Sequence, residues 1–142
     1  MAPQDIADKV REVMLADDAA SRMLGLRVTE IAPGRAVATM TVREDMLNGF
    51  AICHGGLIAT LADSAFAFAC NARNALTVAS GFGIDILKSA KLGDLLTATA
   101  EETSLAGRTG LYDITVRNQH GDLIAMFRGR SHRLGDRKVF EA

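Results

Sequence analysis

The sequence predicts an α+β fold in which one antiparallel sheet of five or six strands curls around a long central helix. The first observation is the run Leu57 to Cys70, which is apolar on nearly all sides and carries a single charged residue. A helix of this composition must be covered on most of its circumference. The second observation is that strand-like segments before and after it are joined by short connections, which is typical of antiparallel neighbours. An antiparallel sheet has one face to bury, and such a helix fills it.

Helices are expected at two places. Residues 54–72 contain the central helix. Residues 1–18 contain an additional N-terminal helix, because apolar positions in this segment recur at the spacing of one helical face and predict a surface helix. These positions are Ile6, Val10, Val13 and Met14.

Strand-like segments account for most of the remaining chain. Two strands form a hairpin around the turn at Pro33 and Gly34. Another follows the central helix and is interrupted by Gly81 and Gly83, which mark a bulge or a place where a ligand approaches the backbone. Residues 43–53 show neither period and are expected to form a loop before the central helix. Further strands lie within residues 94–104, 109–118 and 122–134.

The composition indicates a single compact domain over residues 1–142, long enough to bury a core without a disulfide or metal. Lys and Arg number 16, Asp and Glu number 17, and the charges are scattered, so we expect no nucleic-acid partner and no membrane partner. The apolar run of the central helix is too short to span a bilayer. The N-terminal segment is charged and amphipathic, unlike a secretory signal. We therefore expect a cytoplasmic protein.

Metal and redox chemistry are not expected. The two cysteines, Cys53 and Cys70, form no CxxC pair. The three histidines, His54, His120 and His132, have no ligand-like spacing to the cysteines or to each other. The sequence therefore predicts no metal site.

The start of the central helix and one acid within it form the candidate site. Gly55 and Gly56 leave the backbone N–H groups of the first turn uncovered, and these groups have no partner inside the helix. Together with the positive end of the helix dipole, they can polarise a carbonyl oxygen and stabilise its tetrahedral adduct. Asp63 is surrounded by apolar residues, so it loses hydration and must find a partner or a chemical task.

Gly55 and Asp63 cannot act on one substrate from the same helix. Eight residues separate them, which is about 12 Å along the helix axis. A base or nucleophile must approach to about 3 to 3.5 Å of its target. If both residues act, they therefore come from different subunits. Two such helices packed antiparallel about a two-fold axis would give a homodimer with two shared sites.

Three stretches of the chain carry a resemblance to a known family. They are MLNGFAICHGGLIATLADSAFAFACNA, VASGFGIDILKSAKLGDLLTATA and GRTGLYDITVRNQHGDLIAMFRGRSHRLG. Together they resemble the PaaI-type acyl-CoA thioesterases of the hot-dog fold, in particular the phenylacetate-degradation branch. The resemblance spans about residues 19–135, and its specific part is the spacing of Asn48, the HGG run and Asp63.

The resemblance implies a role for each matching residue. Asn48 orients the attacking water or the thioester, and His54 supports the site at the helix start. The Gly55 backbone N–H donates to the thioester oxygen, and Asp63 of the opposing subunit is the nucleophile or general base. A polar residue near the following strand is also implied, for which Ser80 is the candidate. Substrate contacts are further assigned to Gly56, Gly81 and Arg108.

The implied reaction is hydrolysis of an acyl-CoA, such as phenylacetyl-CoA or hydroxyphenylacetyl-CoA, to the free acid and CoA. Coenzyme A is then part of the substrate, and no separate cofactor is expected. The implied assembly is a dimer with shared active sites, and further a homotetramer built as a dimer of dimers. Basic residues suited to the phosphates of CoA are Lys88, Lys91, Arg108, Arg128, Arg130 and Arg133.

Alternatives remain open at this point. A hydratase or dehydratase acting on acyl thioesters also combines a histidine with a carboxylate, and a non-catalytic acyl-CoA sensor would bind without turnover. Asp63 can instead be a structural acid paired with a buried arginine, and His54 can merely cap the helix. Asn48 and Gly49 also form an ordinary turn pair. A nucleophilic Cys53 thiol acting with His54 is disfavoured, because adjacent residues in an extended loop point apart.

Overall fold

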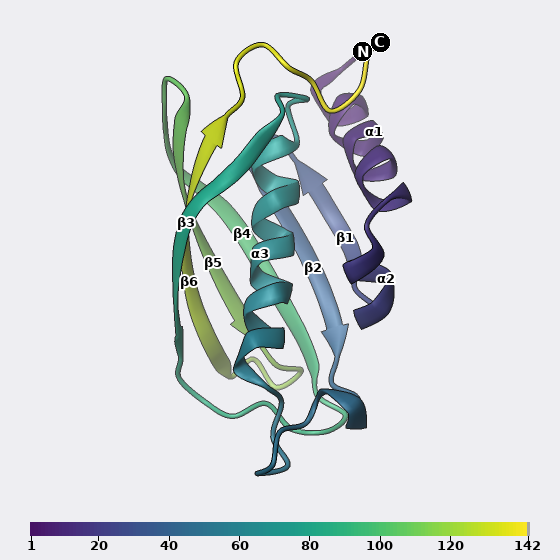
Figure 1. Cartoon of the computed structure of the whole chain (residues 1–142), viewed down its shortest axis with the longest axis vertical. Coiled ribbons are helices and arrows are strands. Elements are labelled where there is room, and N and C mark those ends of the chain that lie inside the picture. The colour runs from purple at the N-terminus through teal and green to yellow at the C-terminus, as the bar shows by residue number, and fades with distance from the viewer. Residues whose placement is uncertain (142) are drawn as a thin grey trace.

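A six-stranded antiparallel sheet and one long helix make up most of the molecule (Figure 1). The computed structural model describes residues 1–141, so Ala142, the last residue of the predicted domain, lies outside the described residues. The sheet has the strand order β1-β2-β4-β5-β6-β3. In chain order the elements are α1 (Pro3–Ala16), α2 (Ala19–Leu24), β1 (Arg27–Ala32), β2 (Arg35–Thr41), the 3-10 helix η1 (Glu44–Met46), α3 (Gly55–Asn71), β3 (Thr77–Ile86), β4 (Leu95–Ala106), β5 (Thr109–Arg117) and β6 (Leu123–Arg133).

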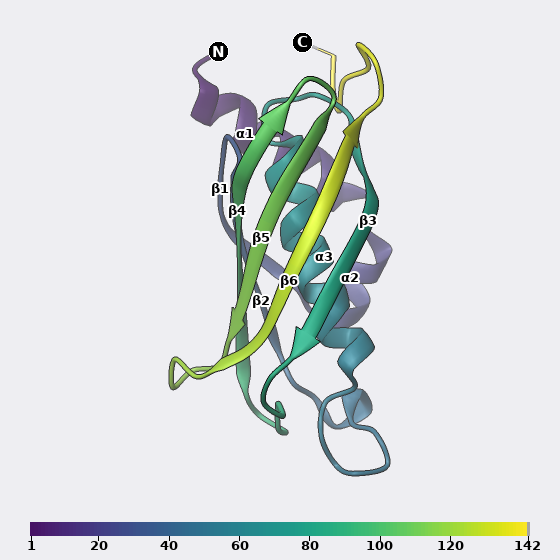
Figure 2. The same ribbon diagram turned by 90° about the vertical axis from the view of Figure 1, so that its left-hand side faces the viewer.

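The sheet curves around α3, as the apolar composition of this helix predicts (Figure 2). Leu61, Ala65 and Phe66 of α3 are fully buried against inward-facing residues of the strands. The Phe66 ring packs at 5.4 Å from the Tyr112 ring, measured between centroids. The helix lies within one residue of the predicted range 54–72 at each end. The predicted arrangement of a five- to six-stranded antiparallel sheet around a long central helix is confirmed, with six strands.

The end of α3 is tied to the start of β3 by one buried side chain. The Asn71 side-chain Oδ1 accepts a hydrogen bond from the Thr77 backbone N–H at 2.9 Å. Its Nδ2 donates to the carbonyl oxygens of Ala67 at 2.8 Å and Thr77 at 2.9 Å. Two of these bonds engage the backbone N–H and carbonyl of Thr77, the first residue of β3. The Asn71 side chain therefore fixes how β3 leaves the helix.

The predicted helix within residues 1–18 is confirmed as α1, and a further helix that the sequence did not predict follows it. Helix α1 ends at Ala16, and a separate short helix, α2, follows. Asp18 caps α2, because its carboxylate accepts a hydrogen bond from the Ser21 backbone N–H at 3.0 Å. Gly25, at φ 66°, ends α2 in the left-handed conformation that glycine adopts most easily.

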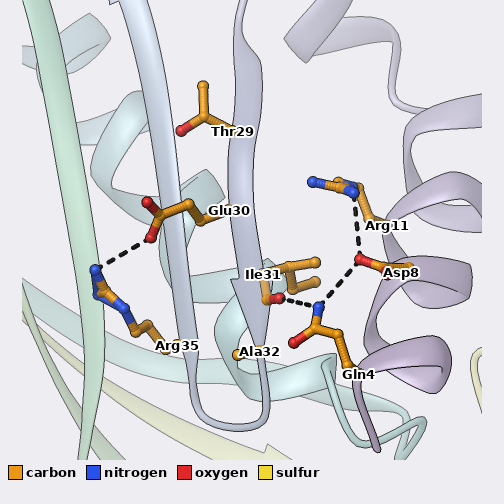
Figure 3. Close-up of a pocket in the computed structure, with 8 residues that line it drawn as sticks. All are labelled: Gln4, Asp8, Arg11, Thr29, Glu30, Ile31, Ala32 and Arg35. Carbon is orange, nitrogen blue, oxygen red and sulfur yellow. Dashed lines mark hydrogen bonds and ion pairs between the residues drawn. The ribbon is translucent and has the colours of Figure 1, made fainter. Parts of the chain in front are cut away.

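The two edge strands of the sheet, β1 and β3, differ in whether another element covers them. Helix α1 covers β1, where Gln4 Nε2 donates to the Ile31 carbonyl at 2.7 Å (Figure 3). Arg11 Nη1 also donates to the Val28 carbonyl at 3.4 Å. Strand β3 pairs with β6 only, and no described strand covers its other edge. Three large apolar side chains along β3 are exposed, namely Val78, Phe82 and Ile86. An open edge of this kind is a template for pairing with another strand.

Across residues 1–141, no helix combines the length and the apolar character needed to cross a bilayer.

Candidate active site

The loop before α3 delivers two glycines to the start of the helix. His54 occupies the N-cap position, and its exposed side chain makes no capping hydrogen bond, so a pure capping role for the imidazole is not observed. The first backbone N–H groups with acceptors are those of Leu57 and Ile58, which donate to the His54 carbonyl. Among the described residues, the N–H groups of Gly55 and Gly56 have no acceptor. They are free to bind an oxygen atom from outside the chain.

The fold of the chain itself does not require glycine at these two positions. Neither Gly55 nor Gly56 has a positive φ. A Cβ added at Gly55 would lie 3.8 Å from Ile86 Cγ1, an ordinary contact, and a Cβ at Gly56 would meet nothing within 4 Å. The backbone is therefore left open toward the outside, which suits the close approach of a ligand or a second chain.

Asp63 lies in the middle of α3 on the part of its surface that this chain covers least. Its side chain is half-buried, and it makes no hydrogen bond and no ion pair with any residue in the range 1–141. The alternative of a structural pair with a buried arginine is therefore not observed. Burial raises the pKa of the Asp63 carboxyl above its ordinary value. A carboxylate of this kind is more basic than one in water.

A largely apolar cavity of about 330 Å³ lies beside Asp63. One wall is α3, which contributes Phe66, Ala67 and Cys70 on the same face as Asp63. The opposite wall is the start of β3 and the loop before it. The remaining lining residues are Met14, Asn71, Leu76, Thr77, Val78, Ala79 and Val139.

Asn48 organises the loop that leads to the helix. Its side-chain Oδ1 accepts hydrogen bonds from the backbone N–H groups of Phe50 at 2.9 Å and Ile52 at 3.4 Å. Its backbone N–H donates to the Ile52 carbonyl at 2.8 Å. The turn interpretation of Asn48 is therefore observed. Its side-chain NH2 group makes no hydrogen bond within residues 1–141 and is free to donate to a ligand.

The other predicted contacts do not meet Asp63 in one place. Ser80 is exposed, its Oγ donates to the Arg130 carbonyl at 3.2 Å, and it lines a different cavity. Gly81 follows a bulge in the β3–β6 pairing, and the Arg130 guanidinium occupies the space beside it.

Arg108 lines a third cavity, of about 270 Å³, with Arg73 and Arg133. This cavity shares Cys70 and Thr77 with the one beside Asp63. Arg73 is already engaged, because its Nη1 lies 2.6 Å from Glu102 Oε2. Arg108 and Arg133 form no ion pair in the described part of the chain.

The two cysteines are free, buried and protonated. Burial raises the pKa of the Cys53 thiol, and its Sγ donates to the His54 carbonyl. Burial also raises the pKa of the Cys70 thiol to about 12. Neither is a ready nucleophile, because the reactive species is the thiolate. No cluster of three metal-ligating side chains occurs in residues 1–141.

Two lining residues of the Asp63 cavity were not anticipated from the sequence. Met14 comes from α1 and Val139 from the segment after β6. Met14 belongs to the apolar stripe that predicts the N-terminal helix, but nothing in that pattern indicates which cavity it reaches. Val139 follows the last predicted strand and carries no local signal.

An antiparallel sheet wrapped around one helix, with free glycine amides at the helix start and an unpaired carboxylate along it, defines the hot-dog class of thioester-processing proteins. The chain belongs to the Thioesterase superfamily, whose family model matches residues 50–125, and it is a thioester hydrolase.

Similar proteins agree with this assignment. The chain is 46% identical to the acyl-coenzyme A thioesterase PaaI of Escherichia coli, over 91% of this chain and 92% of that one. It is 32% identical to human acyl-coenzyme A thioesterase 13, over 89% of this chain and 96% of that protein.

Two solved structures extend the comparison. The structure of E. coli PaaI, from the phenylacetic acid degradation operon, has a TM-score of 0.93 at 43% identity and covers 96% of this chain and 99% of its own. A Streptococcus mutans protein solved with acetyl CoA has a TM-score of 0.76 at 28% identity, over 80% of this chain and 91% of its own.

Proposed function

We propose that this protein hydrolyses an aryl-acetyl thioester of coenzyme A, such as phenylacetyl-CoA or hydroxyphenylacetyl-CoA, to the free acid and CoA. One observation carries the proposal: Asp63, a half-buried carboxylate without a partner among residues 1–141, stands at the wall of an apolar cavity. A thioester needs a base or nucleophile beside a place for an apolar acyl group, and this wall provides both. The names of the E. coli relative and of its operon support the substrate class.

In the proposed reaction, the thioester oxygen accepts a hydrogen bond from the Gly55 N–H at the positive end of α3. Asp63 either attacks the carbonyl carbon or removes a proton from the attacking water. In both routes one water is consumed, the carbon–sulfur bond breaks, and the electron pair leaves with the CoA thiolate. The free NH2 group of Asn48 orients the water or the thioester, and His54 supports the start of the helix.

The two main groups of this mechanism must come from two subunits. Gly55 and Asp63 are separated by about 12 Å along α3, which exceeds the reach of an aspartate side chain. The start of α3 lies beside Ile86, at the end of β3, whereas the cavity of Asp63 is lined by Thr77 to Ala79, at the beginning of β3. The two halves of the proposed site therefore lie at opposite ends of β3, the strand with the open edge.

Antiparallel pairing of two β3 edges brings these halves together. A two-fold axis near the middle of β3 would place the Ile86 end of one strand beside the Val78 end of its partner. The Gly55 amide of one subunit would then face Asp63 of the other. Such a dimer also buries Phe82, which is 50% exposed in the single chain. We extend the proposal to a tetramer built as a dimer of two such dimers.

The phosphates of coenzyme A are proposed to bind Arg108 and Arg133. These two guanidinium groups line one cavity and have no ion-pair partner in the described residues. Two other candidate groups are engaged, since Arg128 pairs with Asp113 and Lys88 with Asp122. We also propose a cytoplasmic location, where two free thiols persist in the reduced state.

Release of CoA thiol from phenylacetyl-CoA, followed with a disulfide reagent, tests the proposal. We expect wild-type turnover, and a loss of roughly 10² to 10⁴-fold in Asp63→Asn, since this variant is neither basic nor nucleophilic. Asp17→Asn is the matched control, because Asp17 is exposed and lies after α1. Wild-type rates in Asp63→Asn would contradict the proposal. Consumption of an enoyl-CoA without thiol release would instead indicate a hydratase, and tight binding without any turnover would indicate a sensor.

A further inference from the structure

Two segments that lie far apart in the sequence each contribute one residue to the lining of the cavity beside Asp63. We propose that Met14 of α1 and Val139 of the segment after β6 set the size limit for the acyl group. This inference rests on the proposed function, because it takes the apolar cavity as the place of the acyl group.

The cavity runs along α3 away from Gly55. Asp63, Ala67 and Cys70 line it at spacings of four and three residues, which places them on one face of the helix. An acyl group whose carbonyl is held at Asp63 therefore extends toward the C-terminal end of α3. Met14 and Val139 are the only lining residues from outside α3, β3 and the loop between them, within the described part of the chain. They form the wall that a longer acyl group would meet.

Val139 is held in place by a clamp on the segment that carries it. Asn74 Nδ2 donates to the Phe140 carbonyl at 2.9 Å, and the Phe140 N–H donates back to Asn74 Oδ1 at 2.9 Å. The Leu76 N–H also donates to the Arg137 carbonyl at 3.0 Å. Figure 1 shows this last segment crossing the end of α3 toward α1.

Asn74 adopts a conformation suited to this role. Its φ is 67°, in the left-handed region where asparagine and glycine are favoured over other residues. Asn74 is therefore a positioning residue: it does not line the cavity, and it acts by holding the neighbour of Val139.

Met14 is fixed through α1. Ala7 and Val10 of this helix are fully buried, and Gln4 and Arg11 bond to β1 carbonyls. Met14 itself is only partly buried and packs against the core. Its unbranched side chain adapts to the shape of a neighbour, so it can close the cavity around acyl groups of somewhat different outline.

The test compares kcat/KM for two substrates, 2-naphthylacetyl-CoA and phenylacetyl-CoA, in each variant. We expect Met14→Ala and Val139→Ala to raise the naphthyl-to-phenyl ratio by about tenfold, the discrimination that a small change in an apolar pocket provides. Val139→Phe should lower the ratio. Asn74→Gly, which tolerates the left-handed φ and removes the clamp, should raise it. Met23→Ala is the matched control, because this methionine lies on α2 and is 65% exposed.

Melting temperatures identify variants that fail to fold. If either Met14→Ala or Val139→Ala fails to fold, the ratio measured for the other variant tests the inference. An unchanged naphthyl-to-phenyl ratio in folded Met14→Ala and Val139→Ala would overturn the inference. If kcat/KM then changes by the same factor for both substrates, the cavity holds the CoA arm and not the acyl group. The size limit and the proposed function are contradicted by different results. Loss of turnover in Asp63→Asn with unchanged ratios removes the size limit only, whereas full turnover in Asp63→Asn removes the proposed function.

Discussion

Asp63 and Cys70 face the same cavity from the same side of α3, seven residues apart. Burial, followed in smaller part by the negative charge of Asp63, raises the pKa of the Cys70 thiol to about 12. The thiol therefore stays protonated at neutral pH and is an inert part of the wall. The carboxylate is the group in this cavity that can take a proton.

Replacing the thiol tests that division of roles. We expect Cys70→Ala to keep hydrolysis within a few-fold of wild type, with a stability loss of about 1 kcal/mol from the small cavity that is left. Thiol release from phenylacetyl-CoA and thermal melting measure both effects. A loss as large as that of Asp63→Asn would show that the sulfur takes part in the reaction.

The pH dependence of kcat/KM should report the burial of Asp63. Because burial raises the pKa of its carboxyl above 3.8, the group becomes protonated and inactive at a higher pH than an exposed aspartate. Activity should therefore fall as the pH drops, with a midpoint above 3.8. The residual activity of Asp63→Asn should lack this limb. A midpoint at or below the ordinary value would mean that Asp63 is not the titrating base.

The raised pKa of the Asp63 carboxyl should also lower the stability of the folded protein at neutral pH. A carboxyl whose pKa is raised in the folded state costs nothing below its unfolded pKa, where both states are protonated, and destabilises the fold as the pH rises through the raised value. Asp63→Asn should therefore melt above wild type at pH 7, and the difference should vanish at about pH 3, below the ordinary pKa. A constant difference at all pH values would contradict this account.

The sheet approaches α3 closely at Gly129. A Cβ at this position would lie 2.7 to 2.9 Å from the ring carbons of Phe66, whose ring also packs against Phe127. Gly129→Ala should thus destabilise the protein by about 1 to 3 kcal/mol through overpacking. Gly49→Ala, in the exposed loop before α3 with nothing within 4 Å of the added Cβ, is the control for denaturant unfolding. Equal stability of both variants would show that Phe66 moves aside freely.

Much of the fold follows from local patterns. The length and apolar character of residues 57–70 predict the buried helix, and period-two segments predict the strands, because both signals depend on neighbours in the chain. The position of Ser80 could not be predicted in the same way. The bulge between Ala79 and Gly81 shifts the register, and a shift of one residue moves side chains to the other face.

The walls of the cavity beside Asp63 depend on contacts between residues far apart in the chain, which no local sequence pattern predicts. Asn74 and Phe140 are 66 positions apart, and neither residue belongs to a periodic pattern. The short helix α2 has a capping residue and a terminal glycine but too few turns to show a helical period. By contrast, the need for two subunits could be predicted from the spacing of Gly55 and Asp63, because helix rise is the same in every protein.

Complementation between two inactive variants tests the central claim most directly. Gly55→Pro removes only the N–H of the first helical residue, a position that accepts proline, and the preceding His54 has the extended ψ of 131° that proline requires. Refolded together in equal amounts, Gly55→Pro and Asp63→Asn should form mixed dimers in which one of two sites is intact. With random pairing, about one quarter of wild-type thiol release should return. No recovery in confirmed mixed dimers would contradict a site shared between subunits.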